Sequence, residues 1–237
     1  MKAIGIIPAR YGSTRFPGKP LIDILGKSMI QRVYEQCSRS SMLTKIIVAT
    51  DDKRIYKHVI GFGGEAMMTS KTHKTGTERC NEVVKNINPK VGVIVNIQGD
   101  EPFINPLQID EVVSLFNNPK TQIGTLIKEI NDITILKDKN SPKAIINKDG
   151  NALNFCRIIN NPSEKETYYK HVGLYAYTKE ILSEICQLSQ SKNELNESLE
   201  QLRWLDNNYT IKVGETSFKT ISIDTKEDLK KIKQKMR

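Results

Sequence analysis

The sequence has no long hydrophobic run and no paired cysteines, and both absences narrow the class of protein. None of its apolar stretches approaches the roughly 20 residues that a membrane-spanning helix needs. The N-terminus passes into Ile6, Ile7 and Pro8 without the pattern of a signal peptide. The four cysteines are scattered and form no Cys-x-x-Cys motif, which argues against a disulfide framework and a zinc site. We therefore expect a cytoplasmic protein with no membrane association.

The net charge of +9 comes mainly from two short segments at the ends of the chain. Residues 1–20 contain four basic and no acidic residues, and residues 219–237 contain seven basic against three acidic residues. No aromatic residues alternate with the basic residues of the second segment, as a stacking platform for nucleic acid would require. We therefore predict that nucleic acid is not a partner.

A basic loop, residues 8–21, follows an apolar run that predicts a buried first strand. The loop supplies three cations, Arg10, Arg15 and Lys19, and contains no carboxylate. Open α/β sheets bind phosphates at the carboxyl end of the first strand. The composition and place of this loop therefore predict a polyphosphate site.

Two familiar phosphate-binding motifs do not describe this loop. The dinucleotide fingerprint needs a G-x-G-x-x-G spacing, which Gly12 and Gly18 lack. The P-loop needs four residues between its glycines and a hydroxyl residue after its lysine, whereas here five residues intervene and Pro20 follows Lys19. The loop is thus a different anion-binding element or, as the alternative, a solvated basic loop.

Strand and helix patterns alternate through the first half of the chain. Strands are predicted at residues 3–7, 45–50, 65–70 and 91–97, and helices at residues 29–37, 55–60, 78–87 and 106–116. Such alternation predicts right-handed βαβ units and a mainly parallel sheet, which is an α/β fold.

The second half of the chain has a different pattern. Asp149-Gly150 between two strand patterns predicts a hairpin over residues 143–158. Further strands are predicted at residues 122–130, 170–177 and 220–223, with helices starting at residues 179 and 195 and one at the C-terminus. The antiparallel pieces suggest a lid or dimerisation region appended to the parallel sheet.

A carboxylate and a cation-rich helix start are predicted near the basic loop. Asp100 follows the strand at residues 91–97 and so lies at the same sheet edge as the loop. Mg²⁺ binds one or two carboxylates together with phosphate oxygens, so we predict Asp100 as a ligand, with a turn residue as the alternative. Arg79 lies in the first turn of a predicted helix, where the helix dipole disfavours a cation, which suggests a role toward an anion.

The motifs together resemble those of 3-deoxy-manno-octulosonate (Kdo) cytidylyltransferases, within the sugar-nucleotide cytidylyltransferases. The run I-P-A-R-Y-G-S-T-R-F-P-G-K-P-L is similar to their amino-terminal signature, and T-G-T-E-R and I-Q-G-D-E-P are similar to later motifs. The resemblance extends over residues 6–229 in the same order. It implies a Rossmann-like, three-layer nucleotide-diphospho-sugar transferase fold. It divides the chain into a nucleotide-binding core (residues 1–130), a sugar-binding and dimerisation subdomain (131–218) and a returning strand and helix (219–237).

The resemblance also implies an activity and a set of site residues. A homodimer would use CTP and Mg²⁺ to transfer CMP to the anomeric hydroxyl of Kdo, for lipopolysaccharide biosynthesis. Arg10, Lys19 and Asp100 would be catalytic, and CTP would contact Arg10, Ser13, Arg15, Lys19, Arg79 and Gln98. The segment I-D-T-K-E-D-L implies Asp224 as a second magnesium carboxylate. The segments around His171 and residues 197–205 imply that the sugar acid is held by His171, Glu200 and Gln201, with Arg157 nearby.

One segment departs from the family pattern and keeps alternatives open. Residues 156–161 lack the family's prolines, and the following loop is short. The sugar acid could therefore be Kdo, its 8-amino analogue or a sialate-like acid. A non-catalytic nucleotide- or nucleic-acid-binding protein is the alternative from a different class.

Overall fold

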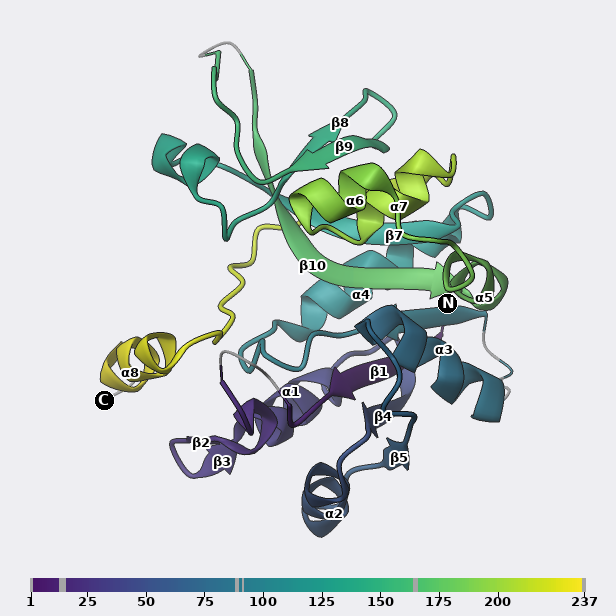
Figure 1. Ribbon diagram of the computed structural model, residues 1–237, viewed down its shortest axis with the longest axis vertical. Coiled ribbons are helices and arrows are strands. Elements are labelled where there is room, and N and C mark those ends of the chain that lie inside the picture. The colour runs from purple at the N-terminus through teal and green to yellow at the C-terminus, as the bar shows by residue number, and fades with distance from the viewer. Residues whose placement is uncertain (1, 13–15, 88–89, 91, 164–165, 236–237) are drawn as a thin grey trace. The chain divides into compact units, whose positions relative to one another are not determined.

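The chain folds into two compact units in a computed structural model that describes residues 2–12, 16–87, 90, 92–163 and 166–235 (Figure 1). The first unit consists of residues 2–110 and 219–237, and the second of residues 111–218. Ser13 and Arg15, two predicted CTP contacts, lie outside the described residues. The functional division at residues 130 and 218 stays a prediction.

The first unit is built on a parallel sheet. Its strands lie in the order β6 (Val93–Asn96), β1 (Ala3–Ala9), β4 (Leu43–Thr50) and β5 (Ala66–Met68). In the register, Ile6 of β1 lies opposite Ile47 on one side and Asn96 on the other. Helices α1 (Met29–Cys37), α2 (Lys53–Gly61) and α3 (Gly76–Ile87) pack against these strands. The predicted α/β fold with a mainly parallel sheet is confirmed.

The C-terminal segment of the first unit differs from the prediction. The alternating Ile221 and Ile223 predicted a strand at residues 220–223, but the chain there is irregular before α8 (Lys226–Lys235). Ile223 is fully buried with Phe16 and Met29 in a hydrophobic cluster. Its N–H donates to the carbonyl of Asp100 at 3.0 Å. The apolar pattern therefore reflects docking of this segment, and the predicted strand is wrong.

The second unit contains a mixed sheet in the order β11 (Ile211–Glu215), β7 (Ile123–Glu129), β10 (Tyr169–Thr178), β8 (Lys143–Ile146) and β9 (Ala152–Cys156). The β8–β9 hairpin is antiparallel, as predicted, and β10 pairs antiparallel with both β7 and β8. Strand β11 pairs parallel with β7 and was missed from the sequence. Its pattern, I-K-V-G-E, is short and ends in glycine and glutamate, which weakens the strand signal.

Short helices complete both units. Helix α4 (Pro106–Ser114) contains the point in the sequence, after residue 110, where the first unit ends and the second begins. The second unit also contains α5 (Lys179–Ile185), α6 (Lys192–Glu197) and α7 (Gln201–Asp206). Single 3-10 turns lie at Lys19–Leu21, Leu115–Asn117 and Ile133–Lys137, and a two-stranded ribbon is formed by β2 (Asp23–Ile24) and β3 (Lys27–Ser28). Among the described residues, no helix is both long and apolar enough to span a membrane.

The helix predicted to start at residue 195 is two helices. The chain breaks at Ser198, which has a left-handed φ of 53°. Because α6 ends at Glu197 and α7 begins at Gln201, Glu200 and Gln201 lie at the start of a new helix. Arg203 of α7 pairs with Glu194 of α6 at 2.6 Å, and this buried ion pair fixes the two helices together.

Gly99 is required where the chain passes from β6 to Asp100. A Cβ at this position would lie 2.9 Å from the carbonyl oxygen of Pro8 in β1, which is backbone and cannot swing away. We expect Gly99→Ala to lower the free energy of unfolding by about 1–3 kcal/mol, as overpacking usually does. Urea unfolding monitored by circular dichroism measures this loss. Gly61→Ala, where a Cβ meets nothing within 4 Å, is the control, and equal stability of the two variants would contradict the prediction.

Candidate functional site

A cavity of about 250 Å³ lies at the carboxyl ends of the strands of the first unit. Arg10 lies directly after β1 and Gln98 follows β6. Six predicted site residues line the cavity, namely Arg10, Lys19, Arg79, Gln98, Asp100 and Asp224. Residues from five separate parts of the sequence thus meet at the sheet edge where α/β proteins bind phosphorylated ligands.

Lys19 connects two carboxylates in this cavity. Its Nζ lies 2.8 Å from Oδ2 of Asp100 and 3.2 Å from Oδ1 of Asp224. The Lys19 side chain is 14% exposed, whereas Asp100 and Asp224 are 29% and 35% exposed. One cation therefore already lies between the two carboxylates that the sequence analysis assigns to a metal.

Local backbone structure explains how these three side chains meet. Gly18 has a φ of 71°, which turns the chain into the 3-10 helix Lys19–Leu21 and starts that helix at Lys19. The bond from the Ile223 N–H to the Asp100 carbonyl holds the segment before α8 next to the loop after β6. Asp224, one residue after Ile223, is thereby brought to Asp100.

The cavity has the donors that Mg²⁺ uses when it binds a nucleotide. Asp100 and Asp224 each lie within 3.2 Å of the same Nζ atom, so both carboxylates can reach one cation. Within the described ranges, no group of three or more His, Cys, Asp or Glu side chains could form an all-protein site. Two carboxylates completed by phosphate oxygens and water match the way proteins bind magnesium with nucleotides.

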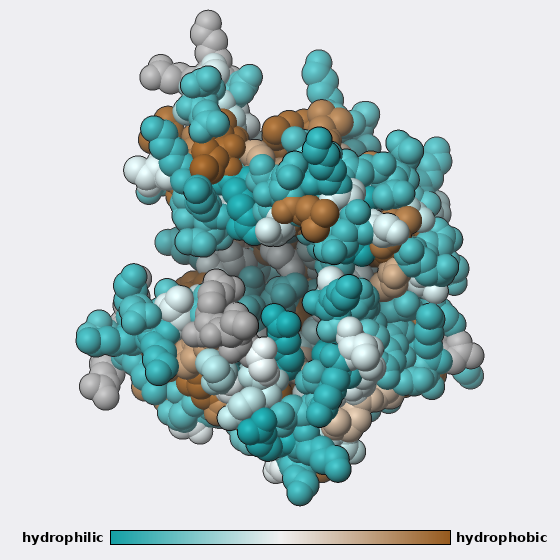
Figure 2. All heavy atoms as spheres, in the orientation of Figure 1, coloured by the Kyte–Doolittle hydropathy of each residue, from teal (hydrophilic) through white to brown (hydrophobic). Residues whose placement is uncertain are grey.

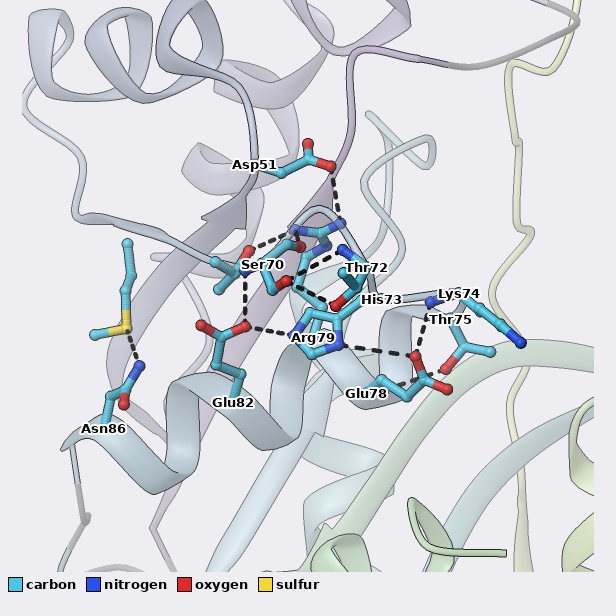
Figure 3. A network of polar contacts seen from close by, with 12 residues as sticks. Asp51, Ser70, Thr72, His73, Lys74, Thr75, Glu78, Arg79, Glu82 and Asn86 are labelled. Carbon is cyan, nitrogen blue, oxygen red and sulfur yellow. Dashed lines mark hydrogen bonds and ion pairs between the residues drawn. The ribbon is translucent and has the colours of Figure 1, made fainter. Parts of the chain in front are cut away.

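Arg79 is held rigidly at the wall of the cavity (Figure 3). The residue is 4% exposed. Its guanidinium donates to Thr69 Oγ1 at 2.5 Å and to the Ser70 carbonyl at 3.2 Å. It also pairs with Asp51, at the end of β4, at 3.2 Å. Arg79 therefore has a fixed orientation before any ligand arrives, which favours binding of an anion.

The loop between β5 and α3 is attached to the helix by two carboxylates. Glu82 accepts the N–H of Ser70 at 2.8 Å, and Glu78 accepts the N–H of Lys74 at 2.7 Å. Burial raises the pKa of the Glu82 carboxyl, but the Ser70 N–H and His73 outweigh this effect and the pKa is lowered. His73 lies between the two carboxylates and also lines the cavity.

The residues predicted for the sugar acid belong to the second unit. His171 is 7% exposed on β10, and burial lowers its pKa to about 3. The ring lies against Phe155 at 5.0 Å and Tyr175 at 5.3 Å between ring centroids. A neutral imidazole between aromatic rings can exchange hydrogen bonds with a hydroxyl without a net charge.

Thr125 indicates which nitrogen of His171 carries the proton. The Thr125 hydroxyl lies 2.8 Å from the Leu174 carbonyl and 3.0 Å from Nε2 of His171. A hydroxyl has one hydrogen, and the carbonyl oxygen can only accept it. We therefore assign the proton of the neutral ring to Nε2, which donates to Thr125 and leaves Nδ1 as an acceptor.

Three buried polar atoms of the second unit have no hydrogen-bond partner among the described residues. Oη of Tyr175, Nε2 of Gln201 and Nε1 of Trp204 are buried and make no hydrogen bond within the described part of the chain. Tyr175 contacts Trp204 edge-on, with 5.1 Å between ring centroids. Leaving such donors unpaired costs about 1–3 kcal/mol each, so a polar ligand that reaches them would recover that energy.

Arg157 and Glu200 have different environments. The Arg157 guanidinium donates to the carbonyls of Glu197, Lys139 and Ser198 at 2.6, 2.7 and 3.0 Å. Arg157 thus fixes the chain after α6. Glu200 is half-buried immediately before α7. Their contacts with a sugar acid stay predictions.

Sequence reasoning missed several residues of these two regions. Thr125, Tyr175 and Trp204 were treated only as strand or helix residues, and His73 only as part of a polar loop. Their importance depends on long-range contacts, such as the 46 residues that separate Thr125 from His171. For His73, a signal was present, because Glu78 and Glu82 follow at a spacing that places both on one face of a helix.

Comparisons with known proteins agree with this geometry. A family model described as cytidylyltransferase matches residues 4–232. The 3-deoxy-manno-octulosonate cytidylyltransferase of Bacteroides thetaiotaomicron is 53% identical, over 97% of this chain and 96% of that protein. The enzyme of the same name from Geobacter sulfurreducens is 42% identical over the full length of both.

A solved structure supports the same relationship. The chain is similar to a CMP:2-keto-3-deoxy-manno-octonic acid synthetase complexed with CTP, with a TM-score of 0.93 and 38% identity. The similarity covers 100% of this chain and 98% of that one. Taken with the cavity at the sheet edge, these matches show that the chain belongs to the cytidylyltransferase family.

Proposed function

We propose that this chain transfers CMP from CTP to the anomeric hydroxyl of Kdo and releases pyrophosphate. The observation that carries the proposal is the meeting of Lys19, Asp100 and Asp224 in one cavity. Cations and paired carboxylates at the edge of a parallel sheet suit a metal-bound triphosphate. The named activity of relatives up to 53% identical supplies the nucleotide and the sugar acid.

Charge stabilisation and positioning account for most of the chemistry. The sugar hydroxyl attacks the α-phosphorus in line, and pyrophosphate leaves from the opposite side. In this proposal Arg10 and Lys19 bind the phosphates and neutralise the charge that develops on the leaving group. Gln98 and the fixed Arg79 orient the reactants beside them. Ser13 and Arg15 remain proposed CTP contacts from the family motif.

Asp100 and Asp224 would hold the magnesium ion. When bound, this ion supplies Lewis-acid stabilisation of phosphate oxygens and lowers the pKa of an attacking hydroxyl. Lys19, which here contacts both carboxylates, would bind a phosphate oxygen when a metal occupies the pair.

Residues of the second unit would bind the sugar acid. His171 presents Nδ1 as an acceptor, and Tyr175 and Gln201 present buried groups that have no hydrogen-bond partner among the described residues. Sugar hydroxyls donate and accept hydrogen bonds, so they complement such a set. Glu200 would add a further acceptor at the start of α7. Since these groups suit any polyhydroxylated acid, an 8-amino or sialate-like acid is the second candidate.

We also propose that two copies of the chain associate. The face drawn in Figure 2 is mainly hydrophilic, with small hydrophobic patches. The second unit exposes Ile145, Leu153 and Leu195 by 43%, 59% and 60%. An exposed apolar patch marks an interface between subunits, so these side chains are where we would place the contact of the homodimer that the family resemblance implies.

Pyrophosphate release tests the proposed function directly. With Mg²⁺, we expect release that requires both CTP and Kdo, and little release with UTP, GTP or ATP. Arg10→Ala should lower turnover at least about tenfold, because a charge-assisted hydrogen bond contributes about 1.5–3 kcal/mol. Arg39→Ala, an exposed cation of the same unit, is the control.

Different results would assign the error to different parts of the proposal. Release with a sialate or amino-Kdo, but not with Kdo, would support the nucleotide site. It would show that the sugar acid was assigned wrongly, and the short loop after Arg157 would be the first segment to reconsider. No release with any of these acids would contradict the assignment and favour a protein that binds nucleotide without catalysis. Full turnover by Arg10→Ala would contradict the role proposed for Arg10.

The buried neutral His171 predicts a specific dependence of stability on pH. Its pKa of about 3 lies below the ordinary value of about 6.5. The unfolded chain therefore binds more protons between these values, and stability falls as the pH falls through this window. Compared with His171→Gln, the wild-type protein should lose up to about 1.4 kcal/mol more per pH unit below pH 6. Denaturant unfolding from pH 7 to pH 4 measures this slope.

The matched control for the pH experiment is His58→Gln, which changes an exposed histidine. Its curve should run parallel to that of the wild-type protein. Parallel curves for wild-type protein and His171→Gln would show instead that His171 is not buried in its neutral form.

A further inference from the structure

His73 lies where the nucleotide cavity meets helix α3. Its Nε2 contacts Oε2 of Glu82, and its Nδ1 lies 3.7 Å from Oε2 of Glu78 (Figure 3). The His73 side chain is 19% exposed and the two carboxylates are 29% and 26% exposed. The imidazole therefore joins two acidic side chains one helical turn apart on α3.

The same carboxylate oxygens also hold the backbone of the loop. Oε2 of Glu82 accepts the Ser70 N–H at 2.8 Å, and Oε2 of Glu78 accepts the Lys74 N–H at 2.7 Å. Two backbone positions, one on each side of His73, are thus attached to α3 through the groups that contact its ring. Without the ring, the loop would be attached to Glu82 only through the Ser70 N–H and to Glu78 only through the Lys74 N–H.

The attached loop forms part of the cavity. His73, Thr75 and Gly76 line it, together with Arg79 of the first turn of α3. Thr69 and Ser70, at the start of the loop, accept hydrogen bonds from Arg79. A shift of the loop would therefore change both the wall of the cavity and the partners that orient Arg79.

We propose that His73 is a positioning residue, which fixes residues 69–76 so that the cavity is preformed for the nucleotide. The inference rests on the proposed function, because it assumes that CTP occupies this cavity. A wall that contacts the nucleotide equally in the ground state and in the transition state changes KM and leaves kcat in place. His73 thus sets affinity for CTP and takes no part in phosphoryl transfer.

Two substitutions of His73 separate positioning from general damage. His73→Leu removes both polar contacts, whereas His73→Gln has an amide nitrogen near the place of Nε2 and can still donate to Glu82. His73→Leu should raise KM for CTP at least tenfold with kcat within threefold of wild type. His73→Gln should raise KM threefold or less. His58→Gln is the control, because the His58 ring contacts Ser28 and not the loop at residues 69–76. This variant should leave both constants unchanged.

Amide hydrogen exchange of the ligand-free protein provides a readout that needs no activity. Ser70 and Lys74 should exchange at least tenfold faster in His73→Leu than in wild type, while β1 amides keep their rates. The proposal is overturned if His73→Leu leaves KM and these exchange rates unchanged. It is also overturned if kcat falls as much as kcat/KM while KM stays unchanged, because His73 would then affect the transition state and not the binding of CTP. If the protein does not use CTP at all, the proposed function fails while the exchange data still report on His73.

Discussion

The ion pairs of Lys19 with Asp100 and Asp224 are the contact on which the first unit's site depends. They join the turn after β1, the loop after β6 and the segment before α8, which are separated by up to 205 residues. Two carboxylates close enough to share one cation would repel each other without it. The arrangement that stabilises the ligand-free protein is therefore the one to which the proposed function assigns a metal and a triphosphate.

Charged side chains also fix the loop before α3, through ion pairs and hydrogen bonds to the backbone. Asp51 and Thr69 fix Arg79, and Glu78 and Glu82 fix the backbone around His73. In the second unit, burial keeps His171 neutral beside Thr125 and the aromatic side chains. The cations of the cavity suit an anionic ligand, and the neutral imidazole of His171 suits hydroxyl groups.

The sequence predicted those features that depend on local patterns. Apolar runs followed by glycine and charged residues located β1, β6 and the residues at their carboxyl ends, because a strand's end fixes which sheet edge a residue occupies.

The strand predicted at residues 220–223 was wrong, since a docked irregular segment and a strand share the same apolar alternation. Ser198 interrupts a helical pattern through a left-handed φ, and neither its residue type nor its neighbours predict this. The contact of Thr125 with His171 and the burial of the Tyr175 side chain depend on how distant strands align, and neither could be predicted.

Binding of Mn²⁺ in the presence of CTP, followed by electron paramagnetic resonance, tests the central claim most directly. The paired carboxylates predict that Asp224→Asn weakens Mn²⁺ binding at least about tenfold, equivalent to about 1.4 kcal/mol. Asp23→Asn, which removes an exposed carboxylate of the same unit, should bind Mn²⁺ as the wild-type protein does. Equal Mn²⁺ affinity for wild type and Asp224→Asn would show that the two carboxylates do not form a metal site.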